Sequence, residues 1–517
     1  MINTERNKEN NLISLVLSTI GFVFTLIYIF KASSDVVSSD YIRIINYYLS
    51  NVTDLKYLLS WESISRIPFA FLARFINVTI FKYSVNFDRI LGIFGLFMFN
   101  FISVRFILNT LNNRVIKIII SIITTFISYS LILWEMILNG SGYPHFIMTG
   151  IIAITFYLFS KTIDSKKYTS YASYLGLYLI ITIGSLCFGG QYSVSFLCTL
   201  MLFSALEILT FVLIKDSYKS ISNKIKIHAF IIIILLSFIC LACFLKSNNT
   251  GEALIPVGFK DITLSELLLN NPKFPLKFLL KSFASSIVGV ETLNYALEAG
   301  KITEKAILIL GFVYLCSIII ALIIVINRIM RCNTRNGFVF DINSYGNIFP
   351  LMYVTYGLAN YLLIFLSRYK FVRDDYGMSS RYGIQYMFLS VGIIIILATY
   401  LDDFISYKKK NESIVNIWVQ ANPIPQGRRS RILYSLATVL CILSITVILV
   451  GHSVTAKDEI HKAKYRKAIY EDRIEKAKIY DTLSDKELES YFEFRRGPEQ
   501  IKSAFSILKK QHLNVFK

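Results

Sequence analysis

The sequence predicts an all-α polytopic membrane protein, and three observations support this fold class. Hydrophobic residues make up 54% of the 517 residues, and charged residues make up only 17%. The mean hydropathy is +0.55, which is higher than soluble proteins of this length usually reach. Stretches such as 118–133 and 307–327 contain no charged residue. A helix needs roughly 20 apolar residues to cross a hydrocarbon core about 30 Å thick, so these stretches predict membrane-spanning helices.

We expect about eleven spans. The first apolar stretch, 12–30, is longer than the apolar region of a signal peptide and therefore predicts a retained helix. The other spans are predicted at 90–110, 116–134, 146–160, 172–188, 193–214, 228–245, 306–327, 348–366, 384–401 and 432–451.

The basic residues predict the orientation of these helices. Short connectors at 139–145 and 189–193 contain no Lys or Arg. The alternate connectors are basic, with Arg114 and Lys117; Lys161, Lys166 and Lys167; Lys215, Lys219, Lys224 and Lys226; Arg328, Arg331 and Arg335; and Lys408–Lys410 with Arg428, Arg429 and Arg431. Basic loops remain in the cytoplasm, so we expect a cytoplasmic N-terminus and, after eleven spans, an extracytoplasmic C-terminal tail.

The same loop bias explains the formal net charge of +20, so we expect no nucleic-acid partner. The high content of Ile, Lys, Asn and Tyr indicates an AT-rich bacterial genome, and hence the bacterial plasma membrane with its lipids as the surroundings of the chain.

Three long segments are predicted on the outer side, at 32–88, 246–305 and 452–517. The first contains YIRIINYYLS and IPFAFLARFINVTIF, which suit helices lying at the membrane surface. The third has charged residues throughout, which predicts soluble helices. We therefore expect a transmembrane domain over 1–451 and a small helical tail over 452–517.

Acidic residues follow the first span directly. Asp35 and Asp40 lie in SSDVVSSDY at the predicted outer surface. Ser and Asp are also ordinary helix N-cap residues, so a capping role is the alternative to a functional one. Further along, Glu62 and Arg66 are spaced i and i+4, which on a helix places them on one face. They could pair with each other, or a carboxylate and a guanidinium could serve a sugar-phosphate ligand.

A second basic region contradicts the loop bias. Four cations, Arg368, Lys370, Arg373 and Arg381, fall within 15 residues on the predicted outer side. An anionic ligand such as a lipid phosphate would explain them. Pairing with Asp374 and Asp375, or contact with lipid headgroups, is the alternative. Glu135 and His145, also at the predicted outer surface, are weaker candidates.

No nucleotide-binding loop, HExxH, GxSxG or metal-spaced His and Cys cluster is present, so ATP-driven transport by this chain and classical hydrolysis lack support. The seven Cys residues form no recognisable disulfide or zinc pattern.

Several ordered motifs together resemble bacterial membrane proteins related to the GT-C superfamily of glycosyltransferases, which use polyprenyl-phosphate sugars. The motifs are SSDY after the first span, WESISRIPFAFLARFI before the second, SRYKF followed by SSRYGIQY before a late helix, and the closing LKKQHLNVF. In the second motif Ser65 stands where a His is common. The set covers nearly the whole chain in order.

The resemblance implies a GT-C-like bundle with catalysis at its outer face. It assigns Asp40 as the preferred general base for the acceptor hydroxyl, Asp35 as the reserve, and Glu62 as a further acidic candidate. The family's better-known members carry two adjacent carboxylates in the first outer loop, whereas this chain has SSD. The choice among the three acids and any need for a divalent metal therefore stay open, and no cofactor is otherwise expected.

The resemblance also assigns the donor site. Arg66, Arg368 and Arg381 correspond to ligands of the donor phosphate, and Tyr382 to a residue that shapes the pocket. The implied partners are a polyprenyl-phosphate-linked sugar and a cell-surface glycan or glycolipid acceptor.

Two other classes of function fit a polytopic membrane protein. A transporter or flippase of lipid-linked envelope intermediates is disfavoured by the long outer segments, and the lack of ionisable residues within the spans counts against ion-coupled transport. A non-catalytic scaffold for envelope assembly predicts that the acids of the first outer segment are dispensable.

Overall fold

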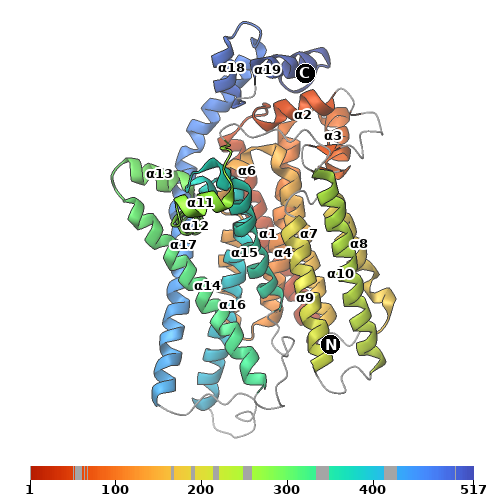
Figure 1. Ribbon diagram of the computed structural model, residues 1–517, viewed down its shortest axis with the longest axis vertical. Helices are drawn as coiled ribbons and strands as arrows, with labels where there is room; N and C mark the ends of the chain where they lie inside the picture. The colour runs from red at the N-terminus through yellow and green to blue at the C-terminus, as the bar shows by residue number, and fades with distance from the viewer. Residues whose placement is uncertain are drawn as a thin grey trace.

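Long apolar helices lying side by side make up most of the chain, which confirms the predicted all-α membrane architecture (Figure 1). The computed structural model describes residues 2–49, 52, 61–62, 65–66, 68–164, 168–187, 193–213, 220–248, 259–333, 348–412, 428–494 and 497–517. In these ranges the strands are β1 (Trp61–Glu62) and β2 (Ser65–Arg66), a short antiparallel pair.

Ten helical segments in the described residues are long and apolar enough to cross a membrane. They are built on α1 (Ile2–Ala32), α4 (Val85–Thr110), α5 (Arg114–Ser128), α7 (Tyr143–Asp164), α9 (Ser193–Leu213), α10 (Ile221–Asn248), α14 (Glu304–Asn333), α15 (Ile348–Arg368), α16 (Gly383–Glu412) and α17 (Arg428–Lys478). The predicted span at 172–188 corresponds to the shorter α8 (Leu175–Cys187), which packs against α7 and α10. At 1.5 Å per residue α8 alone is shorter than a hydrocarbon core, so the number eleven stays a prediction.

The segments predicted to be extracytoplasmic gather at one end of the bundle, the upper end in Figure 1. This end carries α2 (Asp40–Tyr48), α3 (Pro68–Phe81), α6 (Trp134–Leu138), α11 (Leu264–Asn270), α12 (Phe274–Ser285), α13 (Val290–Glu298), α18 (Asp485–Phe492) and α19 (Pro498–Lys510). The N-terminus lies at the lower end and the C-terminus at the upper end (Figure 1). Which end faces the cytoplasm stays a prediction from the basic loops.

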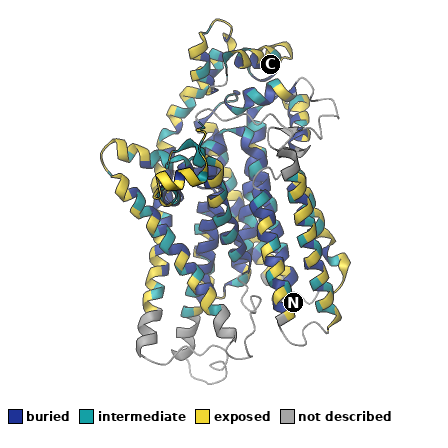
Figure 2. Cartoon of the chain, viewed as in Figure 1, coloured by how far each residue is buried: buried dark blue, intermediate teal, exposed yellow. Residues whose placement is uncertain are grey.

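Helix α16 forms the centre of the bundle. In its most apolar part 89% of the residues are buried, against 28% for α10 at the periphery, and Figure 2 shows this difference as a dark interior and a yellow outer surface. The α16 side chain of Phe388 packs against Phe99, Tyr353 and Tyr356 of α4 and α15. Helices α4 and α7 approach closely because Gly95 has no side chain: a Cβ there would lie 2.0 Å from the Phe146 carbonyl oxygen.

The tail and the first outer segment share a hydrophobic core. Val36, Tyr41 and Ile45 pack with Leu488 and Phe505 in one buried cluster. Backbone hydrogen bonds from Ser39 to Phe492 and from Asn514 to Lys82 join the same segments. Helix α17 continues unbroken from Arg428 to Lys478. The predicted division at residue 452 therefore lies inside a helix, and the two-domain division stays a prediction.

The orientation can be tested with single cysteines in a background without the native ones. We expect a membrane-impermeant maleimide to label Lys510→Cys in intact cells, and Lys8→Cys only after the membrane is permeabilised, because both positions are exposed at opposite ends of the bundle. Labelling of Lys8→Cys in intact cells would contradict the predicted orientation.

Candidate functional site

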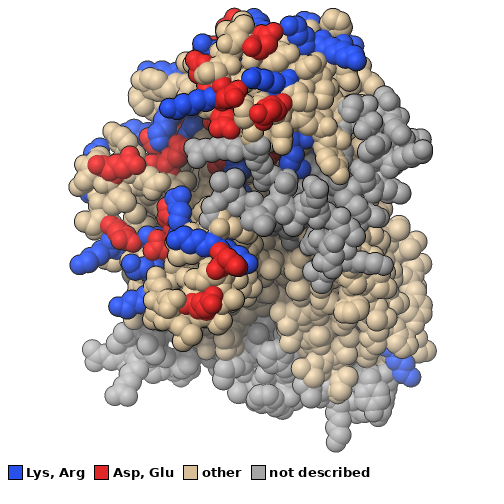
Figure 3. Space-filling view, turned by 45° about the horizontal axis from the view of Figure 1, so that its top comes forward, with Lys and Arg blue, Asp and Glu red and all other residues tan. Residues whose placement is uncertain are grey.

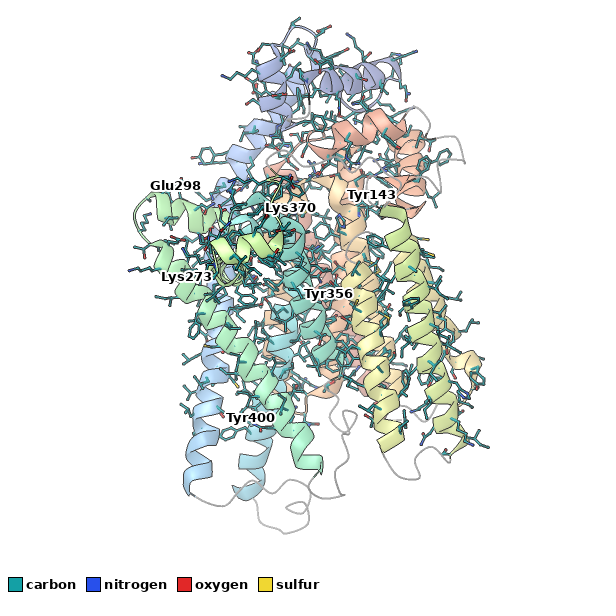
Figure 4. All side chains as sticks on the ribbon, viewed as in Figure 1. Tyr143, Lys273, Glu298, Tyr356, Lys370 and Tyr400 are labelled. Carbon is teal, nitrogen blue, oxygen red and sulfur yellow. The ribbon has the colours of Figure 1, made fainter. Side chains whose placement is uncertain are left out.

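Among the described residues, many charged side chains lie at the upper end of the molecule. Figure 3 shows Lys, Arg, Asp and Glu concentrated over the tail and its neighbouring helices, with an extended tan flank below them. In Figure 4 Lys370 marks the upper end of the bundle and Tyr400 the lower end, with Tyr356 between them. Such a distribution follows from the high cost of placing charge in hydrocarbon.

Arg381 joins three segments at this upper end. Its Nε donates a hydrogen bond to Glu135 Oε1 on α6, and its Nη1 lies 3.9 Å from Asp40 Oδ2 at the start of α2. The hydroxyl of Ser380 donates to the second oxygen of Glu135. Arg381 and Ser380 belong to the 3-10 turn η11 (Ser380–Tyr382), which leads directly into α16. The structure thus brings predicted Asp40 and Arg381 together and adds Glu135 to them.

The two carboxylates differ in how firmly they are held. Glu135 accepts hydrogen bonds on both oxygens, and its side chain is 27% exposed. The Asp40 side chain is 47% exposed and meets Arg381 at 3.9 Å. A long ion pair between half-exposed groups is weak, so an incoming ligand can replace it at little cost. Asp40 is therefore the more accessible acid.

Arg368, the last residue of α15, lies among aromatic rings. Its Nε donates a 2.7 Å hydrogen bond to the Tyr382 hydroxyl. Its guanidinium lies 5.9 to 6.0 Å from the ring centroids of Phe371, Tyr376 and Tyr382. Within the described residues no carboxylate lies within 4.0 Å of Arg368. This arrangement leaves an oriented guanidinium without an opposite charge, next to the group around Arg381.

The other charges of the same segment are paired locally. Arg373 forms an ion pair of 2.8 Å with Asp375, and its hydrogen bond lowers the pKa of Asp375. Asp374 accepts a 2.7 Å hydrogen bond from Lys281 of α12. Pairing with a nearby acid of the same segment therefore explains Arg373. It does not explain Arg368 and Arg381, which contact Tyr382 and the pair Asp40 and Glu135 instead.

Asp35 has a different position. Its carboxylate accepts hydrogen bonds from the Val85 amide at 2.6 Å and the Ser84 hydroxyl at 2.9 Å, and Lys517 lies 3.2 Å away. These contacts satisfy the first amides of α4, as a capping side chain does. Asp40, not Asp35, is the acid that lies beside Arg381.

Glu62 and Arg66 do not share a helix face as expected. Their backbones lie on β1 and β2, where Glu62 is opposite Ser65 and Arg66 is opposite Trp61. A two-residue hairpin has no i, i+4 face, so the helical interpretation is wrong. Their side chains lie outside the described residues.

The expectation that the spans lack ionisable residues is also wrong. Glu207 is fully buried within α9, and Asp88 is buried near the start of α4. Asp88 accepts hydrogen bonds from the Tyr41 hydroxyl at 2.7 Å and the Asn77 amide at 3.0 Å. A single acid such as Glu207 hardly changes the hydropathy of an apolar stretch, whereas Asp88 belongs to the predicted outer segment 32–88.

The described residues contain no group of three or more His, Cys, Asp or Glu side chains that could hold a metal ion. At the candidate site the Arg381 guanidinium contacts both Asp40 and Glu135. The arrangement can therefore offer one accessible carboxylate and two guanidinium groups to a ligand.

No protein-family model, curated protein or solved structure matches this chain. The resemblance to GT-C glycosyltransferases therefore stays a prediction, and the site is defined by its own geometry.

The different roles of the two first-loop acids can be separated by stability. We expect Asp35→Ala to lower the free energy of unfolding by about 0.5–2 kcal/mol, because α4 loses its capping carboxylate. Asp40→Ala should change it by less, since its ion pair is long and exposed. Thermal unfolding of the purified proteins provides the comparison, and equal destabilisation would contradict these assignments.

Proposed function

We propose that the chain is a membrane glycosyltransferase that transfers a sugar from a polyprenyl-phosphate donor to a cell-surface glycan or glycolipid at the extracytoplasmic face. The observation that carries the proposal is the meeting of Asp40, Glu135 and Arg381, with Arg368 close by, at one end of a membrane-spanning bundle. A carboxylate base and phosphate-binding guanidinium groups are the groups that such a reaction needs.

In the proposed reaction the acceptor hydroxyl gives its proton to Asp40. The acceptor oxygen forms a bond to the anomeric carbon of the donor, and the bond from that carbon to the phosphate oxygen breaks. The phosphate leaves with the bonding electrons, and its developing negative charge is stabilised by Arg381 and Arg368. Every proton and charge is accounted for without another reactant.

The contacts support distinct roles for the two acids. Asp40 is more exposed and held by one long ion pair, so it suits a group that must reach an acceptor. Glu135 is held on both oxygens by Arg381 and Ser380, so it suits a positioning residue that fixes the guanidinium. A positioned guanidinium costs less reorganisation when the leaving phosphate develops charge.

The position of Arg368 supports a lipid donor. It is the last residue of the apolar helix α15, so a phosphate bound there would lie at the end of a membrane-spanning helix.

Transport or flipping of a lipid-linked intermediate is the second candidate, and one observation favours it. Glu207 is an acidic side chain buried within the spanning helix α9, where ionisable residues are costly and often functional. A transporter moves its substrate unchanged, whereas the proposed enzyme forms a new glycosidic bond.

The test compares cell-surface glycans and glycolipids by mass spectrometry in a strain lacking the gene and in strains complemented with variants. We expect loss of one sugar from a glycan or glycolipid in the deletion strain. Asp40→Asn should reduce transfer about 10²- to 10⁴-fold, because the carboxylate base is lost. Glu135→Gln should reduce transfer as well, because Arg381 loses its charged partner.

Asp375→Asn is the matched control, since Asp375 is an exposed acid of the same surface that pairs with Arg373. It should support transfer at the wild-type level. If both Asp40→Asn and Glu135→Gln restore the wild-type glycan, the proposed catalytic site is excluded.

A further inference from the structure

A second arginine lacks an opposite charge at the other end of the bundle. Arg105 belongs to α4, which starts beside Asp35 at the upper end and finishes at Thr110. Asn109, near this finish, accepts a 2.8 Å hydrogen bond from Asn10 of α1 close to the N-terminus. Arg105 therefore lies towards the lower end, about one turn inside the helix terminus.

The polar atoms of Arg105 are not satisfied by the protein. Its side chain is half-buried, and its Nε is shielded from solvent without a hydrogen-bond partner. In the part of the chain that the structure describes, Arg105 forms no hydrogen bond and no ion pair. Its guanidinium lies 5.8 Å from the ring centroid of Tyr157 on α7.

Nearby charges at the same end are already engaged. Asp402 of α16 accepts hydrogen bonds from the amides of Asn112 and Asn113, at 2.8 and 2.7 Å. Asp403, the next residue on α16, forms an ion pair with Arg328 of α14. A half-buried cation without a counter-charge is costly, and a bound anion would reduce that cost.

A second cation reaches the same ring. Lys161 lies in the last turn of α7, and its Nζ is 5.5 Å from the centroid of Tyr157. Phe349 of α15 packs edge-on against Tyr157 with a centroid separation of 6.0 Å, so the ring is fixed between helices. Lys161 and Arg105 thus lie 5.5 and 5.8 Å from the centre of the same aromatic ring, one from α7 and the other from α4.

We propose that Arg105 and Lys161 bind the phosphate group of an anionic ligand at the lower end of the bundle. The guanidinium offers paired donors that match phosphate oxygens, and the ammonium adds a point charge. The phosphate belongs either to a phospholipid headgroup or to a soluble phosphate compound. This site is separate from the proposed transfer site and does not depend on the proposed function.

The test uses the full chain purified in detergent, with phosphatidylglycerol, phosphatidylcholine and inorganic phosphate as probes. Thermal unfolding and native mass spectrometry measure binding. We expect phosphatidylglycerol to stabilise the wild-type protein, and Arg105→Gln to lower the apparent affinity about tenfold or more. Lys161→Gln should have a smaller effect, because Lys161 is exposed.

Lys301→Gln is the matched control. Lys301 lies 5.3 Å from the centroid of Tyr295, but Tyr295 is an exposed residue of α13 and Lys301 is exposed on the turn that follows this helix. The variant should bind like the wild-type protein. Stabilisation by phosphatidylglycerol that inorganic phosphate does not reproduce identifies a lipid headgroup, and equal competition by inorganic phosphate identifies a soluble ligand. Absence of both responses, or an unchanged response in Arg105→Gln, overturns the proposal.

Arg105→Met keeps the result interpretable if Arg105→Gln folds poorly. In phosphatidylcholine alone, where no anion compensates the guanidinium, Arg105→Met should unfold at the wild-type temperature or above it, because an uncompensated charge is removed. It should also lose the response to phosphatidylglycerol. A clearly lower unfolding temperature in phosphatidylcholine would mean that the protein itself satisfies Arg105, which overturns the proposal.

Discussion

The contact between Arg381 and Glu135 connects the parts of the chain that form the candidate site. The two residues are 246 positions apart in sequence, and the ion pair joins the turn before the central helix α16 to α6. Because α16 is the most buried of the spanning helices, the turn that precedes it has a fixed position. Asp40, on α2, meets the same guanidinium. The geometry of the site therefore depends on how Arg381 is held.

A second set of contacts fixes the surroundings of this site. Arg466 of α17 lies over the ring of Trp134, the neighbour of Glu135, at 3.3 Å from its centroid. The same guanidinium pairs with Glu459 and with Glu291 of α13. Paired charges that also have hydrogen bonds keep a defined arrangement where the environment is partly dry. These contacts hold α6 against the long helix α17, so Glu135 has little freedom to leave Arg381.

Hydropathy predicted the spanning helices well because the bilayer demands long apolar stretches whatever the tertiary contacts are. Capping boxes form at Thr263 and Ser484, where a Glu follows three residues after the capping side chain, so these helix starts depend on local sequence alone. The partner of Arg381 could not be predicted in this way, because Glu135 comes from a distant segment of the chain. A single acid next to a Trp carries no local pattern that indicates its partner. The helical interpretation of Glu62 and Arg66 failed because an i, i+4 spacing places two residues on one face only if the segment is helical, and this segment forms a hairpin. Arg105 lies within the predicted span 90–110, against the expectation of spans without ionisable residues, and only the contacts around it show that it has no opposite charge among the described residues.

A structure of the full chain in a lipid nanodisc with added polyprenyl phosphate would test the central claim most directly. The account predicts phosphate density within hydrogen-bond distance, about 3 Å, of Arg381 or Arg368, with Asp40 facing the same space. Phosphate bound only at a site remote from both arginines, with the ion pair of Asp40 and Arg381 unchanged, would contradict it.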